Sequence, residues 1–321
     1  MNGNNVLLNP KCLCDEYLTD KVGMLVMAYP CNHIYHEKCS KKMKFCFFCK
    51  KRVKFFLDQN ILEKYKYKHR TIYQMWIDIN SFNFEKKGLS ALQNIRFSLR
   101  TPYLSYLFYS CYSNPTKKNI VENIDKLFDV FNINLIIENK YLDRNIKKIY
   151  VLNHSNYLDS LISFKVLGCG FVASSIIKQT GLMDIIQKIS PCLIIDRGIS
   201  KNTVEQIKDF VDKHNKIFIF PEGMITNQNT LGKFRSGAFV TGHPVQPVVI
   251  QYKTKLSNCS NVKNFVLNTF SKEQIDVVVK FLPIIKTKPF NKDFVKNYTR
   301  LQMAKEGNFY LSRVTNRIIQ D

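Results

Sequence analysis

The stretch "VLNHSNYLDS", residues 151–160, ends an apolar run at Asn153 and His154 and places Asp159 five positions after the histidine. An imidazole beside a carboxylate is a pairing that many enzymes use to move protons. The chain has 6 histidines in 321 residues, so one pair at this spacing also arises by chance. The rest of the sequence therefore decides whether this pair belongs to a site.

Short apolar runs bounded by polar residues recur after residue 90. They predict strands over 133–139, 149–152, 192–195, 216–220, 247–252 and 275–282. Helices are predicted over 157–167, closed by Gly168, and over 203–214, opened by a capping box of Thr203 and Gln206. Continuous apolar strands between helices indicate an α/β fold, with a central, mostly parallel or mixed sheet flanked by helices.

Polar clusters follow the ends of these strands. Asp196–Arg197–Gly198 follows one and Phe220–Pro221–Glu222–Gly223 follows another, with "KFRSGAF" (233–239) and "HPVQPVVI" (243–250) later in the chain. The carboxyl ends of parallel strands lie at one edge of a sheet, where open α/β sheets bind their ligands. We therefore expect these clusters to lie near the His154–Asp159 pair.

In their order and spacing, the four blocks resemble those of the glycerolipid acyltransferase family, which includes 1-acylglycerol-3-phosphate and lysophospholipid acyltransferases. "NHSNYLD" matches its Asn-His-x-x-x-x-Asp block, "LIIDRG" its arginine block, "FPEGMIT" its Phe-Pro-Glu-Gly block and "VQPVVI" its proline block. The resemblance covers about residues 120–285. Asn156 and Met224 stand where the family usually has Ser and a small Thr or Ser.

This resemblance implies an O-acyltransferase that moves a fatty acyl group from acyl-CoA to the hydroxyl of a glycerol phosphate or a lysophospholipid. His154 would take the hydroxyl proton as general base, and Asp159 would bond its other ring nitrogen. Since this chemistry needs no protein nucleophile, Cys169 and Cys192 are interpreted as buried apolar residues.

The resemblance also implies a set of substrate-binding residues: Asn153, Arg197, Pro221, Glu222, Gly223, Lys233 and Arg235. Arg197 would hold the acceptor phosphate through a bidentate fork, and Glu222 would orient the acceptor. Three structural alternatives stay open. The His154–Asp159 pair could be a local hydrogen bond, Arg197 a surface ion-pair partner, and Glu222 a carboxylate that caps a helix.

Metal-ligand residues crowd into the start of the chain. Six of the 10 cysteines and two of the 6 histidines fall within residues 12–49: Cys12, Cys14, Cys31, His33, His36, Cys39, Cys46 and Cys49. Eight such ligands suit two tetrahedral Zn²⁺ ions, which would supply much of the folding free energy of so short a region. The alternative is free cysteines with incidental histidines. Because no signal peptide precedes them, a reducing intracellular compartment is expected.

The ligand order resembles that of the RING finger with two central histidines. The resemblance implies interleaved sites, one formed by Cys12, Cys14, His36 and Cys39 and the other by Cys31, His33, Cys46 and Cys49. Phe47 stands where ubiquitin-ligase RINGs commonly have Pro. This departure counts against recruitment of a ubiquitin-conjugating enzyme. The resemblance nevertheless implies an alternative function: a RING-type ubiquitin ligase, tethered to membranes by an acyltransferase-like domain, with a ubiquitin-conjugating enzyme as its partner.

The chain is strongly basic, with 48 Lys and Arg against 25 Asp and Glu, a formal charge of +23. Such an excess attracts polyanions. "KKMKFCFFCKKRVKFF" (41–56) interleaves basic and aromatic residues. It is interpreted first as a solvated surface, then as a contact for anionic lipid, and least of all as a contact for nucleic acid.

No window reaches the roughly 18 uncharged apolar residues of a spanning helix. The nearest is "TPYLSYLFYSCYSNPT" (101–116), where Thr101 can cap a helix and Pro102 suits its first turn. Its tyrosines favour the headgroup zone, although a core helix explains them as well.

We expect a RING-like module over 1–54, a linker over 55–90 and an acyltransferase domain over 91–321, with an interfacial membrane helix over 91–116. The predicted location is peripheral or monotopic, on the cytosolic face of an endomembrane.

Overall fold

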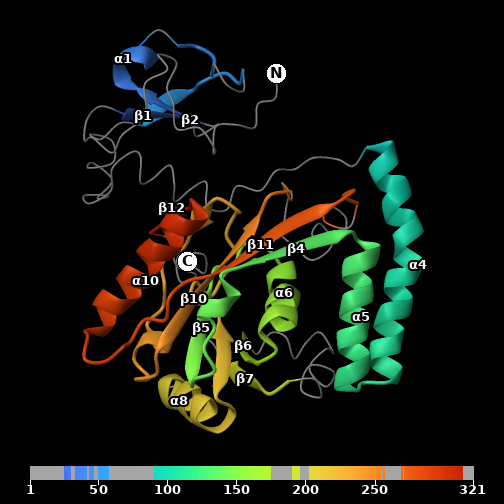
Figure 1. Cartoon of the computed structure of the whole chain (residues 1–321). Helices are drawn as coiled ribbons and strands as arrows, with labels where there is room; N and C mark the ends of the chain where they lie inside the picture. The colour runs from blue at the N-terminus through green and yellow to red at the C-terminus, as the bar shows by residue number, and fades with distance from the viewer. Residues whose placement is uncertain are drawn as a thin grey trace. The chain divides into compact units, whose positions relative to one another are not determined.

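The computed structural model describes residues 25–29, 33–41, 43–46, 50–57, 90–174, 190–195, 202–254, 256, 269 and 271–313. The chain divides into two compact units (Figure 1). The first unit comprises Met1–Asn83, Asn229–Gly232 and Tyr310–Val314. The second unit comprises Phe84–Gln228, Lys233–Phe309 and Thr315–Asp321.

The first unit contains a three-stranded antiparallel sheet in the order β2-β1-β3. Its strands are β1 (Leu25–Tyr29), β2 (His33–His36) and β3 (Phe55–Leu57), and a single helical turn, α1 (Glu37–Ser40), follows β2. Leu25, Val26 and Tyr35 are buried in this small unit, and Val26 lies opposite Tyr35 in the sheet. A short parallel pair, β9 (Thr230–Leu231) with β12 (Tyr310–Leu311), also belongs to this unit.

The second unit is built on a seven-stranded sheet in the order β4-β11-β10-β5-β8-β6-β7. Its strands are β4 (Ile133–Glu138), β5 (Lys148–Leu152), β6 (Gly170–Ser174), β7 (Cys192–Ile195), β8 (Lys216–Ile219), β10 (Val245–Tyr252) and β11 (Ile275–Phe281). Strands β10, β5, β8, β6 and β7 run parallel, whereas β11 pairs antiparallel with β10 and carries β4 beside it. The predicted α/β fold with a mixed sheet is therefore confirmed, as are all six predicted strands.

Helices cover both faces of this sheet (Figure 1). Helix α6 (Leu158–Leu167) leads from β5 to β6, and α8 (Thr203–His214) leads from β7 back to β8. These crossovers step in opposite directions along the sheet, so right-handed connections place their helices on opposite faces. Helix α5 (Lys117–Val130) lies on the α6 face with α4 (Ala91–Ser113) packed outside it, whereas α10 (Lys292–Gly307) lies against β10 on the α8 face.

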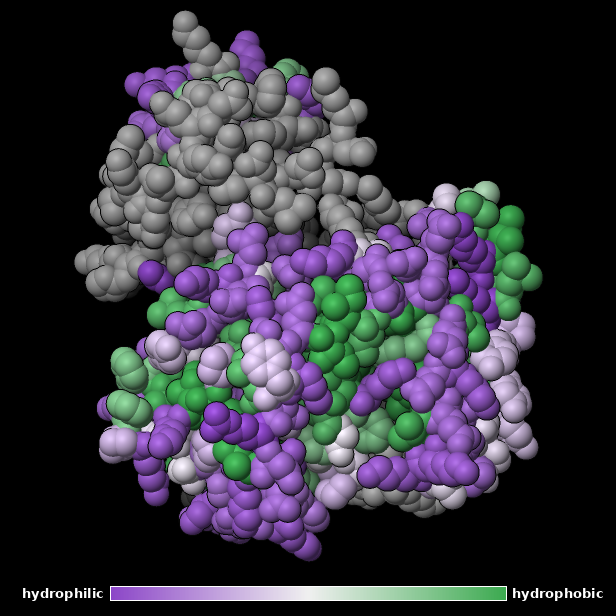
Figure 2. Space-filling view, in the orientation of Figure 1, coloured by the Kyte–Doolittle hydropathy of each residue, from purple (hydrophilic) through white to green (hydrophobic). Residues whose placement is uncertain are grey.

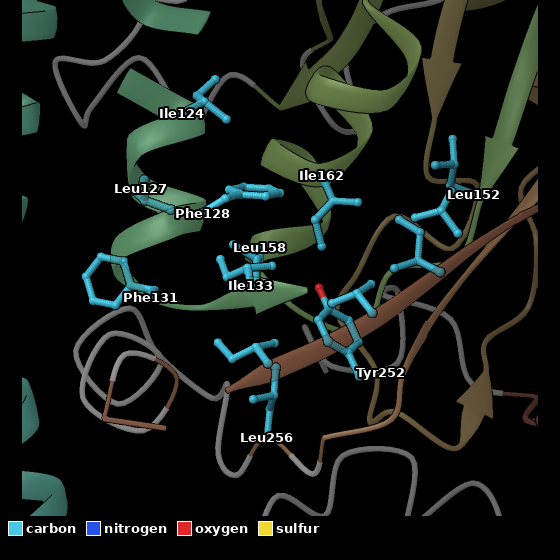
Figure 3. Close-up of a cluster of buried hydrophobic side chains, with 14 of the residues drawn as sticks. Ile124, Leu127, Phe128, Phe131, Ile133, Leu152, Leu158, Ile162, Tyr252 and Leu256 are labelled. Carbon is cyan, nitrogen blue, oxygen red and sulfur yellow. The ribbon is translucent and has the colours of Figure 1, made fainter. Parts of the chain in front are cut away.

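The main core fills the space between the sheet and helices α5 and α6 (Figure 3). In this view Phe128 of α5 points toward Ile162 of α6, and the same cluster contains Leu152 of β5 and Tyr252 of β10. Each of these four side chains is buried. This packing holds the end of β5, the start of α6 and the end of β10 together, which is where the predicted site residues lie.

Two predicted helix caps are wrong, although α8 spans the predicted residues 203–214. Helix α4 begins at Ala91, where Ser90 and Gln93 form a reciprocal capping box. Thr101 therefore lies inside the helix and donates its hydroxyl to the Phe97 carbonyl at 2.8 Å, and Pro102 also lies within the helix. Thr203 is the first residue of α8 rather than its cap; the cap is Asn202, without a side-chain hydrogen bond.

Among the described residues, none of the helices is both long and apolar enough to cross a bilayer. Helix α4 is the longest of them, and its apolar side chains alternate with serine, arginine and tyrosine.

Candidate active site

His154 and Asp159 meet in the turn between β5 and α6. The Nδ1 atom of His154 lies 3.0 Å from Oδ2 of Asp159, which belongs to the first turn of α6. The same Oδ2 accepts the backbone N–H groups of Ser155 at 2.7 Å and Asn156 at 2.8 Å. Asp159 is fully buried, yet these donors and the positive end of the α6 dipole stabilise its negative charge.

The ring of His154 is fixed in one orientation. It stacks on Phe220 with 4.2 Å between ring centroids and 15° between planes. With Nδ1–H donated to Asp159, Nε2 carries the lone pair and can accept a proton. Within the described part of the chain, no hydrogen-bond partner of Nε2 is found, and 17% of the His154 side chain is exposed. The site therefore presents a proton acceptor to solvent or to a ligand.

Asn153 ties β5 to β10. Its side-chain N–H donates to the Ile250 carbonyl at 2.9 Å, and its side-chain oxygen accepts the Ile250 backbone N–H at 2.8 Å. The side chain is buried, so both ends of the amide are used within the protein. Asn153 was predicted to bind substrate. In this structure its side chain clamps β5 to β10 and so fixes the backbone immediately before His154.

Glu222 supports the backbone of His154 from the neighbouring strand. It follows β8, which pairs in parallel with β5. Its Oε1 accepts the His154 backbone N–H at 2.7 Å, and Thr226 donates its hydroxyl to Oε2 at 3.3 Å. Glu222 is only 1% exposed. The loop around it is not helical, so the interpretation of Glu222 as a helix cap is wrong.

Arg235 lies against this loop. Its backbone N–H donates to the Pro221 carbonyl at 2.9 Å, and its Nε would lie 3.1 Å from a Cβ atom added at Gly223. Gly223 has a φ of +67°, a conformation that favours glycine. Because it has no Cβ atom, the Arg235 guanidinium can lie over its backbone. Lys233 is exposed, and no contact joins it to His154 or Glu222.

Arg197 lies outside the described residues. Strand β7, which ends at Ile195 just before it, runs parallel to β5 and β8, so its carboxyl end lies at the same edge of the sheet. The two cysteines interpreted as apolar are poor nucleophiles: burial raises the pKa of Cys169 to about 12 and also raises that of Cys192.

Four of the eight predicted zinc ligands, Cys12, Cys14, Cys31 and Cys49, lie outside the described residues. The other four are His33, His36, Cys39 and Cys46, and the described residues contain no cluster of three or more metal-binding side chains. The Nδ1 atom of His33 lies 3.2 Å from Sγ of Cys46. His33 and His36 are three residues apart in β2 and therefore point to opposite faces.

The sequence interpretation missed three neighbours of the pair. Tyr252 donates its hydroxyl to Oδ1 of Asp159 at 2.5 Å, Phe220 stacks on the imidazole, and the Thr226 backbone N–H donates to the His154 carbonyl at 2.9 Å. Tyr252 ends a predicted strand and Phe220 ends another. The strand ends therefore pointed to these residues, but the order of the strands in the sheet did not follow from the pattern.

Comparison with known proteins finds similarity to acyltransferases. Residues 134–251 match the protein-family model described as Acyltransferase. "Lysophospholipid acyltransferase LPEAT1" from Arabidopsis thaliana is 27% identical over 182 residues, which make up 51% of this chain and 46% of that protein. "Lysophosphatidylcholine acyltransferase 1" from Homo sapiens is 32% identical over 148 residues, or 41% of this chain and 27% of that protein. The chain thus spans less than half the length of these relatives.

Among solved structures, the 1-acyl-sn-glycerophosphate (LPA) acyltransferase PlsC from Thermotoga maritima is similar, with a TM-score of 0.49 and 16% sequence identity. The similarity covers 68% of this chain and 94% of that one. The span matched by the family model contains His154, Asp159, Glu222 and Arg235. Residues 134–251 of this chain are thus similar to the acyltransferase family model.

Proposed function

We propose that this protein transfers a fatty acyl group from acyl-CoA to the hydroxyl of a glycerol phosphate or lysophospholipid acceptor. The observation that carries this proposal is the 3.0 Å contact between His154 Nδ1 and Asp159 Oδ2, which leaves Nε2 as a proton acceptor. It lies within the segment matched by the acyltransferase family, and the similar proteins include lysophospholipid acyltransferases.

The reaction would begin with proton transfer from the acceptor hydroxyl to Nε2 of His154. The acceptor oxygen attacks the thioester carbonyl, so that a C–O bond forms and the C–S bond to coenzyme A breaks. The imidazolium returns its proton to the departing thiolate. Asp159 stabilises the imidazolium while it exists, because its buried carboxylate contacts the opposite ring nitrogen.

An anionic acceptor suits the cations around the site. Arg235 lies over Gly223, next to the Glu222 carboxylate that holds His154. A guanidinium binds phosphate oxygens in bidentate fashion, so Arg235 is proposed as one phosphate contact and Arg197 as a second. Lys233 remains a weaker proposal, since its exposed ammonium is strongly hydrated.

An anionic membrane surface is the partner that we propose for α4. Leu92, Ile95, Leu99, Tyr103 and Tyr106 are exposed on this helix at spacings of three and four residues, and therefore form one stripe. Figure 2 shows hydrophobic residues gathered over the amino-terminal part of α4. The helix contains Arg96 and Arg100 and no acidic residue. Such a helix would lie in the headgroup layer with its apolar side chains inserted.

Two structural Zn²⁺ ions are proposed for the first unit. Zinc bonds of about 2.0 Å to nitrogen and 2.3 Å to sulfur place two tetrahedral ligands about 3.5 Å apart. The 3.2 Å between His33 and Cys46 is close to this value, and the opposed faces of His33 and His36 fit two separate ions. Native mass spectrometry should find two zinc ions per chain; a metal-free folded chain would refute this proposal. The ubiquitin-ligase alternative depends on residues 47–49, which lie outside the described residues, and no described contact favours it.

The test of acyl transfer uses the full chain with radiolabelled acyl-CoA and a panel of acceptors: lysophosphatidate, lysophosphatidylcholine, lysophosphatidylethanolamine and glycerol 3-phosphate. We expect labelled diacyl product, or lysophosphatidate from glycerol 3-phosphate, with at least one acceptor, and a large loss of that product in Asp159→Ala. The exposed Asp125→Ala variant controls for the loss of a carboxylate. Absence of product from every acceptor, with folded protein and vesicles present, would contradict the proposal.

A further inference from the structure

Tyr252 is bonded to the carboxylate behind the catalytic histidine. Its hydroxyl donates to Oδ1 of Asp159 at 2.5 Å, from the last residue of β10. Tyr252 is 8% exposed and Asp159 is fully buried, so solvent does not compete for this bond. In Figure 3 the hydroxyl oxygen of Tyr252 points toward the start of α6, where Asp159 lies.

The two oxygens of Asp159 are held unequally. Oδ2 receives His154 Nδ1–H and the backbone N–H groups of Ser155 and Asn156. Oδ1, in contrast, accepts the Tyr252 hydroxyl at 2.5 Å. A carboxylate held at one oxygen can still turn about its Cβ–Cγ bond. The bond to Tyr252 fixes the second oxygen and therefore the plane of the group.

Strand β10 holds the turn between β5 and α6 at two points. Two residues before Tyr252, the backbone of Ile250 makes both hydrogen bonds to the Asn153 side chain. Asn153 immediately precedes His154, and Tyr252 donates to Asp159, which lies five positions after His154. The end of β10 thus sets the position of the histidine backbone and the orientation of its carboxylate together.

We propose that Tyr252 is a positioning residue of the active site, which keeps Asp159 oriented to receive the Nδ1–H of His154 during proton transfer. This inference rests on the proposed acyl transfer and adds a third member to the His154–Asp159 pair. Tyr252 does not touch the substrate, because its hydroxyl is buried on Asp159. Its removal therefore changes the rate of the chemical step and leaves acceptor binding unchanged.

The kinetic test compares Tyr252→Phe with Tyr150→Phe. Tyr150 lies in the same sheet and is the matched control. Its hydroxyl also donates to a largely buried aspartate, Asp143, at 2.6 Å. We expect Tyr252→Phe to lower kcat about tenfold with KM unchanged, the scale of one charge-assisted hydrogen bond. Tyr150→Phe should leave kcat within about twofold of wild type while destabilising the fold. Equal kcat losses in the two variants would overturn the inference.

A double-mutant cycle shows whether Tyr252 acts through Asp159. If it does, adding Tyr252→Phe to Asp159→Asn produces no further loss of kcat, since the oriented carboxylate is already gone. An additional tenfold loss in the double variant would overturn the inference.

A spectroscopic measurement tests the same point without depending on turnover. The hydrogen-bonded Nδ1–H of His154 gives a downfield imidazole proton resonance, assigned by its loss in His154→Gln. We expect this resonance to broaden or disappear in Tyr252→Phe and to persist in Tyr150→Phe. Its persistence in both would contradict the positioning role. A wild-type protein that shows the resonance but forms no acyl product would instead refute the proposed function alone.

Discussion

The backbone N–H of His154 donates to Oε1 of Glu222 at 2.7 Å, which joins the ends of the neighbouring parallel strands β5 and β8. The Thr226 backbone N–H returns a hydrogen bond to the His154 carbonyl at 2.9 Å. The histidine is thus held by its backbone from β8, by its ring through Phe220, and by its Nδ1 through Asp159.

Glu222→Ala should destabilise the protein and slow the reaction together. The substitution leaves the buried N–H of His154 without an acceptor, which costs about 1–3 kcal/mol. Glu222→Gln keeps an acceptor oxygen and should lose less. Urea unfolding measures the first effect, with the exposed Glu122→Ala as control. A large loss of activity in Glu222→Ala at unchanged stability would instead show that the carboxylate acts on the acceptor.

Asn153→Ala should be among the more destabilising changes at this site. It removes two hydrogen bonds and strands both backbone groups of Ile250 in a buried position, at a cost of about 2–3 kcal/mol. Asn134, whose exposed amide donates to Asp276, is a matched control, and Asn134→Ala should stay within about 0.5 kcal/mol of wild type. A change in the midpoint of urea unfolding that is equal for both variants would argue against the clamp.

A buried ion pair lies near the amino end of β5. The ammonium of Lys148, with a fully buried side chain, is 2.5 Å from Oδ1 of Asp143, which also accepts the Tyr150 hydroxyl at 2.6 Å. Burial alone would raise the pKa of Asp143, but the hydrogen bonds from Lys148 and Tyr150 outweigh it and hold that pKa below its ordinary value. Burial also lowers the pKa of Lys148, so the intact pair contributes little net stability.

Asp143→Asn should cost about 3 kcal/mol at pH 7, because it leaves the charge of Lys148 buried without its partner. Since the pKa of Asp143 is lower in the folded chain, its contribution is fully present above the ordinary value of 3.8 and is lost as pH falls below it. The difference in free energy of unfolding between wild type and Asp143→Asn, measured with urea, should therefore narrow below about pH 4. A gap that stays constant down to pH 3 would contradict the pairing.

The exposed stripe of α4 should bind anionic vesicles. Leu99→Ser combined with Tyr106→Ser removes its most exposed member and one further exposed member, and should lower partitioning about tenfold or more, since burying one leucine contributes about 1.5–3 kcal/mol. Tyr141→Ser, at a residue 81% exposed and outside α4, is the control. Co-sedimentation with phosphatidylglycerol vesicles measures the difference, and equal binding of all three proteins would place the contact elsewhere.

The sequence predicted six strands of the seven-stranded sheet because each contains a short apolar run bounded by polar or breaking residues, as "KIFIF" does before Pro221. It predicted Asp159 because that partner lies one turn along the chain from His154. Tyr252 and the backbone role of Glu222 could not be predicted, since both depend on β10 and β8 flanking β5 in the sheet.

The helix errors have local causes. Pro102 suggested that a helix begins near residue 101. The cap is instead Ser90, eleven residues before Thr101, and Pro102 lies inside the helix. Helix α10 was not predicted, because Phe294, Tyr298 and Leu301 are exposed while Thr299 is buried, which obscures the apolar period.

The most direct test of the account is the initial rate of coenzyme A release by the His154→Gln variant, measured with the best acceptor and compared with wild type. Glutamine keeps a polar side chain of similar reach but cannot take a proton, so the general-base contribution of about 10²–10⁴-fold should disappear. The thermal melting of the variant should match wild type, because the side chain is partly exposed and its backbone bonds remain. A release rate within about threefold of wild type would show that His154 is not the base, and the central claim would fall.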